Sequence, residues 1–443
     1  SNERESQQRG KPKCEEYKIS INTNEWWQNF NDPKLNQLVK LALKNNLNYK
    51  ISLKNIAIAK TYITENTSDF FPQINLNYNL SRTAFSNNGA VANQQNSGQG
   101  KIFNLNQLDA TVSYEIDVWH QVANSVNQAK SDAQSSAANS RVIQLSLISA
   151  VVNTYFQINA LGADINSTKE ELSLAKDNLK LLNSNYRGGL VDIGSVDDAK
   201  TQLESIQSNL SSLEKQKQTM INTLAYLIGE YPENFNLKIK NTLTAPISAS
   251  LIPQSLPSQI LTNRPDIEEA FYQILSYGYF EKQSLANFFP AFSLTGTYGY
   301  ASSALKNFIS KGSLLWDFGL NMIQPLFDYQ KRASQHQRAK LQYEAAVLNY
   351  KDVVLNSFKE VDTALVSYQK DQASFIASER QLWATKEKLD LAYAQYKSGF
   401  NDYATYLNYR INFLQAKYNS INQKLAVLSD IVQVYKTLGL GVN

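Results

Sequence analysis

Few side chains in this sequence are of the types that do catalytic chemistry, and those few are isolated. The 443-residue chain has one cysteine, Cys14, and two histidines, His120 and His336, none of which has another cysteine or histidine beside it. One cysteine excludes an intrachain disulfide, and a lone histidine is a weak basis for a metal site. The chain also has no Gly-x-Ser-x-Gly, His-Glu-x-x-His or phosphate-loop motif, so the sequence predicts no enzyme, metal or cofactor site.

Polar side chains that could form ion pairs and hydrogen bonds gather in two related phrases. Residues 185–199 read NYRGGLVDIGSVDDA and residues 395–409 read QYKSGFNDYATYLNY, each with Tyr-x-x-Gly ahead of carboxylates, amides and hydroxyls. Glycine favours the left-handed conformation that ends a helix, and Ser195 followed by Asp198 is a capping-box-like start for a returning helix. The phrases therefore predict two turns, each between antiparallel helices.

Long helices are expected to position these turns. No proline occurs from about residue 121 to 187 or from about 331 to 398, and a helix of that length spans about 100 Å. In and after these stretches, apolar residues repeat at alternating spacings of three and four, as in a coiled-coil seam. One such series is Leu203, Ile206, Leu210, Leu213, Lys217, Met220, Leu224 and Leu227. The pattern predicts antiparallel helix pairs with an apolar stripe and a polar remaining face.

A second pair of related phrases predicts β-structure. Residues 68–80 read SDFFPQINLNYNL and residues 286–298 read ANFFPAFSLTGTY. After each Phe-Phe-Pro, apolar residues alternate with small or polar ones, the period of a strand with one apolar and one polar face. Another alternating run follows each, beyond a polar loop. We expect one β-hairpin in each half, at about residues 73–118 and 291–326.

The chain is therefore read as an internal repeat, with one β-hairpin and two long helices in each half. A connector with Pro232, Pro246, Pro253 and Pro257 separates the halves. The predicted bounds are 1–229 for the first repeat, with helices at about 121–187 and 195–228, 230–260 for the connector, and 261–443 for the second repeat, with helices at about 331–398 and 402–436.

The alternating strands favour a membrane location. No apolar run approaches the length of a membrane helix, whereas strands with one apolar and one polar face are typical of a transmembrane barrel. Four strands cannot close such a barrel, and an open edge in lipid is prohibitive, so the chain must oligomerise if its strands span. A trimer supplies twelve strands. The 43 basic and 39 acidic residues are spread along the chain, which gives no indication of nucleic-acid binding.

Several further phrases identify a resemblance to a known family. Taken together and in this order, they resemble the TolC-like outer-membrane channels, specifically the lipoprotein-type exit ducts of resistance-nodulation-division efflux pumps. The phrases are WWQNFNDPKLNQLVKLAL (26–43), FFPQINL (70–76), VSYEIDVW (112–119), RPDIEEA (264–270) and FFPAFSLTG (288–296). The resemblance implies an α+β membrane protein: a homotrimer with a 12-stranded outer-membrane β-barrel, four strands per chain, and a long periplasmic α-helical barrel, built from two internal repeats.

The resemblance also implies a function. The chain is expected to form a passive exit duct in the outer membrane of a Gram-negative bacterium, extending into the periplasm and exporting drugs or other small toxic compounds. Its implied partners are two further copies, a periplasmic adaptor, an inner-membrane resistance-nodulation-division transporter and outer-membrane lipid, with no cofactor. A metal-ion efflux duct, a type I secretion duct and a coiled-coil rod without a channel are the alternatives.

In this family the Tyr-x-x-Gly turns form the periplasmic tip, where ion pairs and hydrogen bonds close the channel. The residues here that match the tip are Arg187, Gly189, Asp192, Ser195, Asp197, Asp198, Tyr396, Gly399, Asn401, Asp402 and Thr405. Some relatives place an arginine at the position of Asn401 and an aspartate at that of Ser195, so this sequence departs from the usual gate pair at both positions. A substitute lock would join Arg187 or Lys397 to Asp192 or Asp402. Alternatively, these carboxylates only complement helix N-termini.

The lone cysteine has a separate implied role. Many relatives carry an acylated N-terminal cysteine, and Cys14 is the candidate for such a lipid anchor. The preceding residues, Lys-Pro-Lys, differ from the small and apolar residues expected before an acylation site.

Overall fold

The computed structural model describes residues 22–86, 102–235, 238–253 and 257–442. Cys14, the predicted lipid anchor, lies outside the described residues. The chain divides into two compact units, and each is described here by itself. The helical unit comprises Ser1–Leu47, Gln144–Arg264 and Ser357–Asn443, and the sheet-bearing unit comprises Asn48–Ile143 and Pro265–Asn356.

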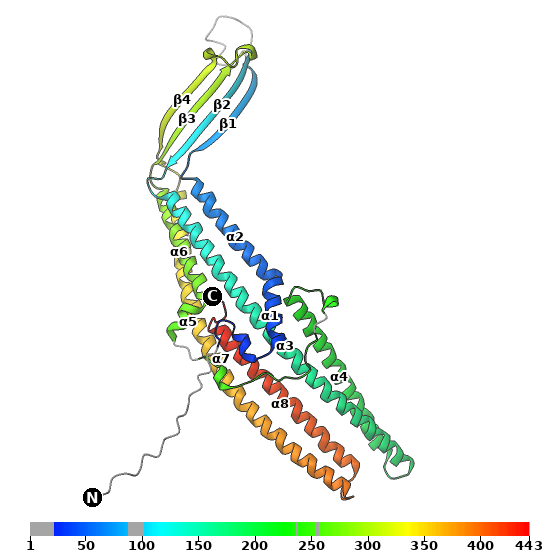
Figure 1. Cartoon of the computed structure of the whole chain (residues 1–443). Helices are drawn as coiled ribbons and strands as arrows, with labels where there is room; N and C mark the ends of the chain where they lie inside the picture. Colours follow the sequence, from blue (N-terminus) through cyan, green and yellow to red (C-terminus); the bar gives the residue numbers. More distant parts are fainter. Residues whose placement is uncertain (1–21, 87–101, 236–237, 254–256, 443) are drawn as a thin grey trace, which may run out of the picture. The chain divides into compact units, whose positions relative to one another are not determined.

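The sheet-bearing unit contains a four-stranded antiparallel sheet (Figure 1). Its strands are β1 (Gln73–Ala84), β2 (Ile102–Ile116), β3 (Ala291–Ser302) and β4 (Leu314–Ile323), in the order β1-β2-β3-β4. The two predicted hairpins therefore lie next to each other and pair through β2 and β3. This order leaves β1 and β4 as edge strands, each with one row of backbone groups unpaired by another described strand.

The sheet has one apolar and one polar face, because its register keeps the alternation of all four strands in phase. One apolar row across the sheet is Leu76, Ala110, Tyr298 and Trp316. The adjacent row, one residue along each strand, is polar and consists of Asn75, Thr111, Thr297 and Asp317. On the polar face, Asn77 donates to the carboxylate of Asp109 at 3.2 Å and Gln107 donates to it at 2.8 Å.

Polar contacts link four helices of the same unit one to the next. The helices are α2 (Leu47–Ser68), the first part of α3 (Gln121–Arg187), α6 (Pro265–Ala286) and the first part of α7 (Lys331–Lys397). The hydroxyls of Ser52 and Ser140 lie 2.8 Å apart and join α2 to α3. Gln283 on α6 donates to Gln128 on α3 at 2.6 Å. The hydroxyl of Ser284, also on α6, lies 2.9 Å from Nδ1 of His336 on α7, so this histidine is engaged in packing.

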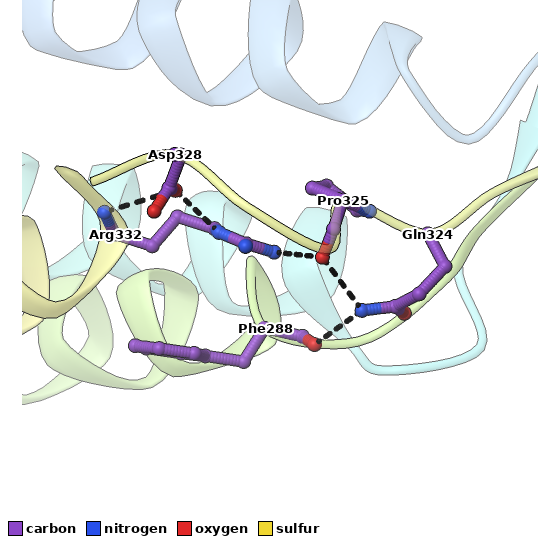
Figure 2. A network of polar contacts seen from close by, with 5 residues as sticks. All are labelled: Phe288, Gln324, Pro325, Asp328 and Arg332. Atoms are coloured by element: carbon purple, nitrogen blue, oxygen red, sulfur yellow. Dashed lines mark hydrogen bonds and ion pairs between the residues drawn. The ribbon is translucent and has the colours of Figure 1, made fainter. Parts of the chain in front are cut away.

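The passage from β4 into α7 is fixed by a compact polar network, drawn in Figure 2. Arg332 donates through Nε to Asp328 at 2.6 Å and through Nη1 to the carbonyl of Pro325 at 2.9 Å. Gln324 donates to the carbonyl of Phe288 at 3.3 Å, and the Arg332 guanidinium lies 5.9 Å from the Phe288 ring centre. The network ties the start of α7 to the segment that follows α6.

The helical unit is built around the tryptophan-rich phrase near the start of the described chain. Trp26 is fully buried and stacks on Tyr435 of α8 (Tyr403–Thr437), with ring centres 5.0 Å apart. Asp32 caps α1 (Pro33–Asn45) and accepts a 2.7 Å hydrogen bond from the Tyr155 hydroxyl on α3. A buried carboxylate that accepts hydrogen bonds from backbone N–H groups and from a hydroxyl is a well-satisfied polar group. Because Trp26 is also fully buried, the Trp-Trp phrase is part of the core.

The Arg-Pro-Asp-Ile phrase has a structural role in the same unit. Arg264 follows α5 (Pro257–Asn263) and is 8% exposed. Its guanidinium donates to the carbonyl of Thr437 at 3.0 Å and forms a 2.8 Å ion pair with Glu360. Because α5 begins at Pro257, the predicted connector of 230–260 includes the first residues of this helix.

The first predicted seam joins two helices of this unit. Leu172 and Ala175 on α3 pack with Ile206, Leu210 and Leu213 on α4 (Ile193–Leu227). The heptad interpretation of α3 and α4 is thereby confirmed. No described helix carries an apolar stretch long enough to cross a membrane.

Residues 238–245 of the connector, here called the strap, contact three of the long helices. Lys217 on α4 donates to the side chain of Asn241 at 2.7 Å, and Lys424 on α8 donates to the carbonyl of Leu243 at 2.9 Å. A Cβ atom at Gly162 on α3 would lie only 2.8 Å from the Cα of Asn241. The strap therefore depends on a glycine for its close approach to α3 and on two lysines for its attachment to α4 and α8.

Candidate functional site: the helical turns

Two matching turns end the hairpins of the helical unit, one between α3 and α4 and the other between α7 and α8. Gly189 and Gly399 both have φ of +73°, a left-handed conformation that residues with a Cβ rarely adopt. Their backbone bonds match as well, with Gly189 N–H donating to Tyr186 at 2.9 Å and Gly399 N–H donating to Tyr396 at 3.0 Å. The repeated Tyr-x-x-Gly phrase thus encodes the same helix end twice.

The first carboxylate after each glycine caps the returning helix. Asp192 accepts from the backbone N–H and the hydroxyl of Ser195, both at 2.8 Å, and Asp402 accepts from the backbone N–H of Thr405 at 2.8 Å. The bond from the Ser195 amide, followed by that from its hydroxyl, lowers the pKa of Asp192 below its ordinary value. The side chain and then the amide of Thr405 lower the pKa of Asp402.

This arrangement corrects the predicted start of α4. Helix α4 begins at Ile193 and not at 195, and its cap is Asp192 and not Ser195. The physical reason is that a carboxylate satisfies the free N–H of the first turn and also complements the helix dipole. The Ser195 hydroxyl acts here as a donor to the cap.

Most of the remaining predicted tip residues form local contacts. Asp197 pairs with Lys200 on its own helix at 3.1 Å, Asp198 is exposed, and Asn401 donates to Gln395 at 2.6 Å. Lys397 lies 5.0 Å over the ring of Tyr393.

Within the described part of one chain, neither Arg187 nor Lys397 forms an ion pair with Asp192 or Asp402. The substitute lock among these four residues stays a prediction.

Four tyrosines join α7 to α8 beside the second turn. Tyr393 lies 5.5 Å from Tyr406, and Tyr396 lies 5.4 Å from Tyr403 and 5.9 Å from Tyr406, all between ring centres. Tyr403 and Tyr406 are 6.0 Å apart. Aromatic pairs at these separations stabilise beyond their buried area, so the second hairpin is held firmly together near its turn. Tyr396 was predicted at the tip, and the structure gives it these partners.

A contact that the sequence did not predict joins the two hairpins to each other. Arg410 on α8 forms a 2.6 Å ion pair with Glu170 on α3, and its Nη1 lies 3.3 Å from the hydroxyl of Tyr406. The bond to Glu170 is the main cause that raises the pKa of Arg410. Leu174 on α3 packs beside this pair against the α8 residues Leu407 and Leu414.

One signal in the sequence could have found this contact. Tyr403, Leu407, Arg410 and Leu414 follow spacings of four, three and four, so Arg410 occupies a seam position where an apolar residue is expected. Glu170 precedes Leu174 by one helical step of four on α3.

Comparison with known proteins identifies the family. The model of the family described as "Outer membrane efflux protein" matches residues 38–230 and 256–440. The chain belongs to this family. Solvent efflux pump outer membrane protein SrpC of Pseudomonas putida is 26% identical over 413 residues, which cover 93% of this chain and 86% of that protein.

Solved structures of outer-membrane channels share the fold. The Campylobacter jejuni CmeC channel superposes with a TM-score of 0.88 at 26% identity, over 96% of this chain and 89% of that one. The open state of the Neisseria gonorrhoeae MtrE channel gives a TM-score of 0.81 at 25% identity, over 96% and 93% of the two chains. These findings confirm the TolC-like fold, the outer-membrane location and the efflux-channel function that the resemblance implied.

Proposed function

We propose that three copies of this chain assemble into a passive duct that carries small toxic compounds out of the cell for a tripartite pump. The duct performs no chemical step of its own. The inner-membrane transporter supplies the energy, and a periplasmic adaptor connects it to the helical turns.

The observation that carries this proposal is the open sheet. Strands β1 and β4 are both edges of an amphipathic four-stranded sheet, and unpaired edges in lipid are very costly. Pairing β4 of one copy with β1 of the next satisfies both edges at once. Two copies would give an eight-stranded barrel, and the interior of a barrel of that size is largely filled by side chains. Three copies give twelve strands and leave a lumen, with the apolar face toward lipid and the polar face toward water.

Two helices of the sheet-bearing unit support the same head-to-tail assembly. On α7, Leu341, Leu348 and Leu355 recur every seven residues and are 52%, 64% and 71% exposed in one chain. On α2, Ile51 and Ile58 are seven apart and also exposed. Because the polar contacts link α2 to α3, α3 to α6 and α6 to α7, the two stripes lie on the first and last helices of this series. A neighbouring copy would bury both.

The exposed side chains of the turns suit an adaptor. Leu190, Ile193 and Phe400 are largely exposed, next to the two glycines that fix the turn conformation. Apolar side chains held on a rigid turn offer a binding surface of low entropic cost. We assign these turns to the contact with the adaptor.

A susceptibility panel tests the function and its alternatives. A strain lacking the gene is compared with the same strain carrying it, across dyes, detergents, solvents, antibiotics, copper and silver. We expect hypersensitivity to several unrelated amphiphiles, restored by the gene. Sensitivity confined to a metal would support the metal-efflux alternative, and loss of a secreted protein without sensitisation would support the type I secretion alternative.

Assembly is tested on the purified protein. We expect a trimer in detergent by mass measurement, and ion-conducting channels after reconstitution into planar bilayers. A helical monomer without conductance would contradict the duct and favour the coiled-coil rod.

A further inference from the structure

The loop between β3 and β4 folds back over the sheet. Its residues 303–313 read SALKNFISKGS and lie at the end of the strands opposite α2 and α6 (Figure 1). Phe308 of this loop packs against Tyr78 of β1, with ring centres 6.4 Å apart. By the sheet register, Tyr78 lies on the same face as Leu76 and Tyr298. The loop therefore covers part of the apolar face of the sheet and not the polar face.

A buried side chain on β2 supports this path. Asn106 lies on the same face, opposite Leu80 and Ser302 in the register, yet it is only 3% exposed. Its side chain donates to the carbonyl of Ser302 at 3.3 Å. A loop that starts from β3 and reaches Tyr78 on β1 must cross β2, which accounts for the cover over Asn106. The loop thus leans away from the β4 edge, which the proposed assembly pairs with the next copy.

Hydrogen bonds within the loop fix its conformation. The hydroxyls of Ser310 and Ser313 both donate to the carbonyl of Asn307, at 2.9 and 2.7 Å. At the start of the loop, the Ser302 hydroxyl donates to the carbonyl of Ala304 at 2.9 Å. Side chains carried on a backbone that is already ordered lose less entropy when they bind a partner.

This ordered loop exposes two large apolar side chains. Leu305 is 70% exposed and Ile309 is 74% exposed. Water is an unfavourable environment for such side chains, and their burial in an apolar medium is worth about 25 cal/mol per Å². In the proposed duct the loop lies at the outer rim of the barrel, on the side of the sheet that faces lipid. Acyl chains of the outer leaflet are therefore the medium that would cover both side chains.

The charges around these two side chains are all positive. Lys306 and Lys311 of the loop are exposed, and so is Arg82, which lies on the same face of β1. Within the described strands and residues 303–313, this face and the loop carry no aspartate or glutamate. Cationic side chains next to exposed apolar ones form the combination that binds anionic lipid surfaces.

We propose that the β3–β4 loop binds a phosphorylated lipid of the outer leaflet. Lys306 and Lys311 contact the phosphate, and Leu305 and Ile309 insert among the acyl chains. The proposal rests on the proposed function, because it uses the outward face of the sheet, and it adds a lipid ligand to that face. The site would occur three times in a trimer.

The test measures lipid binding to the purified full-length trimer by native mass spectrometry, with bisphosphorylated lipid A as the probe. We expect Lys306→Gln with Lys311→Gln to lower the affinity about tenfold or more, because two charges attracted to the anionic headgroup are lost. Dephosphorylated lipid A should bind the unmodified protein with similarly reduced affinity. Leu305→Ser with Ile309→Ser should weaken the binding of both lipids, because the acyl chains lose their contacts.

A matched control removes the same charge elsewhere. Lys386→Gln with Lys388→Gln changes two exposed lysines of α7 and should leave the affinity for lipid A unchanged. All variants are checked for trimers in detergent before lipid is added.

Several outcomes would overturn the lipid site. Unchanged affinity in the loop lysine variant or in the apolar variant would do so, as would an equal loss in the α7 control or equal affinity for the two lipids. Displacement of lipid A by inorganic phosphate would indicate a site for a free anion instead. Failure of the unmodified protein to form trimers and channels would contradict the proposed function, and this is measured before lipid binding, so the two failures are distinguishable.

Discussion

At the scale of single residues, a carboxyl group between α3 and α8 makes the helical unit sensitive to pH. Asp164 is 2% exposed and accepts a 3.2 Å hydrogen bond from Asn422. Burial raises the pKa of Asp164 from 3.8 to about 7, against the lowering effect of Asn422. Between these two values the folded chain holds a proton that the unfolded chain has lost. Stability is therefore lost as the pH rises from about 4 to about 7, and the loss is complete above that range.

Replacing this carboxyl group by an amide should remove the pH dependence. We expect Asp164→Asn to be more stable than the unmodified chain at pH 8, by about 2–4 kcal/mol for a shift of this size, and the difference to shrink toward zero near pH 4. Denaturant unfolding followed by circular dichroism at several pH values measures this. Asp198→Asn, at an exposed aspartate, is the control. A difference that is the same at pH 4 and pH 8 would show that the effect is not titration of Asp164.

Two substitutions of Asp402 distinguish its role as a helix cap from its predicted role in a charge lock. Because Asp402 accepts the Thr405 amide, Asp402→Ala should lower stability by about 1 kcal/mol, whereas Asp402→Asn keeps an acceptor and should cost only a few tenths. Thermal unfolding in detergent gives both values. The charge lock predicted from the sequence makes a different claim, that Asp402→Asn raises the resting conductance as much as Asp402→Ala does. Equal conductance for Asp402→Asn and the unmodified channel would count against that lock.

At the scale of elements, the position of the strap depends on the small size of Gly162. A methyl group at Gly162 would collide with backbone and side-chain atoms of Asn241, so Gly162→Ala should displace the strap and lower stability by about 1–3 kcal/mol. Gly278→Ala on α6 is the matched control, because its new methyl would lie 3.5 Å from Tyr343, an ordinary contact. That control should gain up to about 1 kcal/mol from helix propensity. Denaturant unfolding compares the two, and equal effects would contradict the role given to the strap.

Long elements could be predicted from the sequence because their signals are local and repeated. The absence of proline and the heptad series define α3 and α7, whose observed bounds Gln121–Arg187 and Lys331–Lys397 lie within a residue of the predicted ones. The alternation likewise indicates all four strands. The pairing of β2 with β3 could not be predicted, because it joins strands about 190 residues apart and depends on the whole fold.

The site was predicted less completely than the fold, for a physical reason. Gly189 and Gly399 were found because a left-handed turn restricts the residue type. The choice between Ser195 and Asp192 as the cap depends on which side chain reaches a free N–H, and both types serve. Arg410 was missed because its partner lies 240 residues away on α3, and only its seam position indicated it.

At the scale of the whole molecule, the polar face of the sheet gives the proposed lumen a charge. The charged residues on this face of the described strands are Asp109, Glu115 and Asp317. A trimer would triple each of them. Rings of carboxylates favour cations in a pore, and an exposed ring acts within about 10 Å at 0.1 M salt.

This charge predicts the selectivity of the reconstituted channel. We expect the unmodified channel to prefer potassium over chloride, and Glu115→Gln with Asp317→Asn to reduce that preference. Reversal potentials in a salt gradient measure it. Arg82→Gln, on the opposite face by the alternation of β1, should leave the reversal potential unchanged. A channel without cation preference would contradict the assignment of the polar face to the lumen.

The strap also determines where a movement of the hairpins would be greatest. Since Lys217 and Lys424 attach it to α4 and α8, both hairpins are held at its level, and a separation of the turns becomes a tilt about that level. From Lys424 to Tyr403, α8 forms a lever arm of about 30 Å. A tilt of about 10° at the strap would therefore carry the second turn sideways by about 5 Å, while side chains next to the strap shift by a small fraction of that. A wide aperture at the turns is thus compatible with nearly unchanged packing around Asn241.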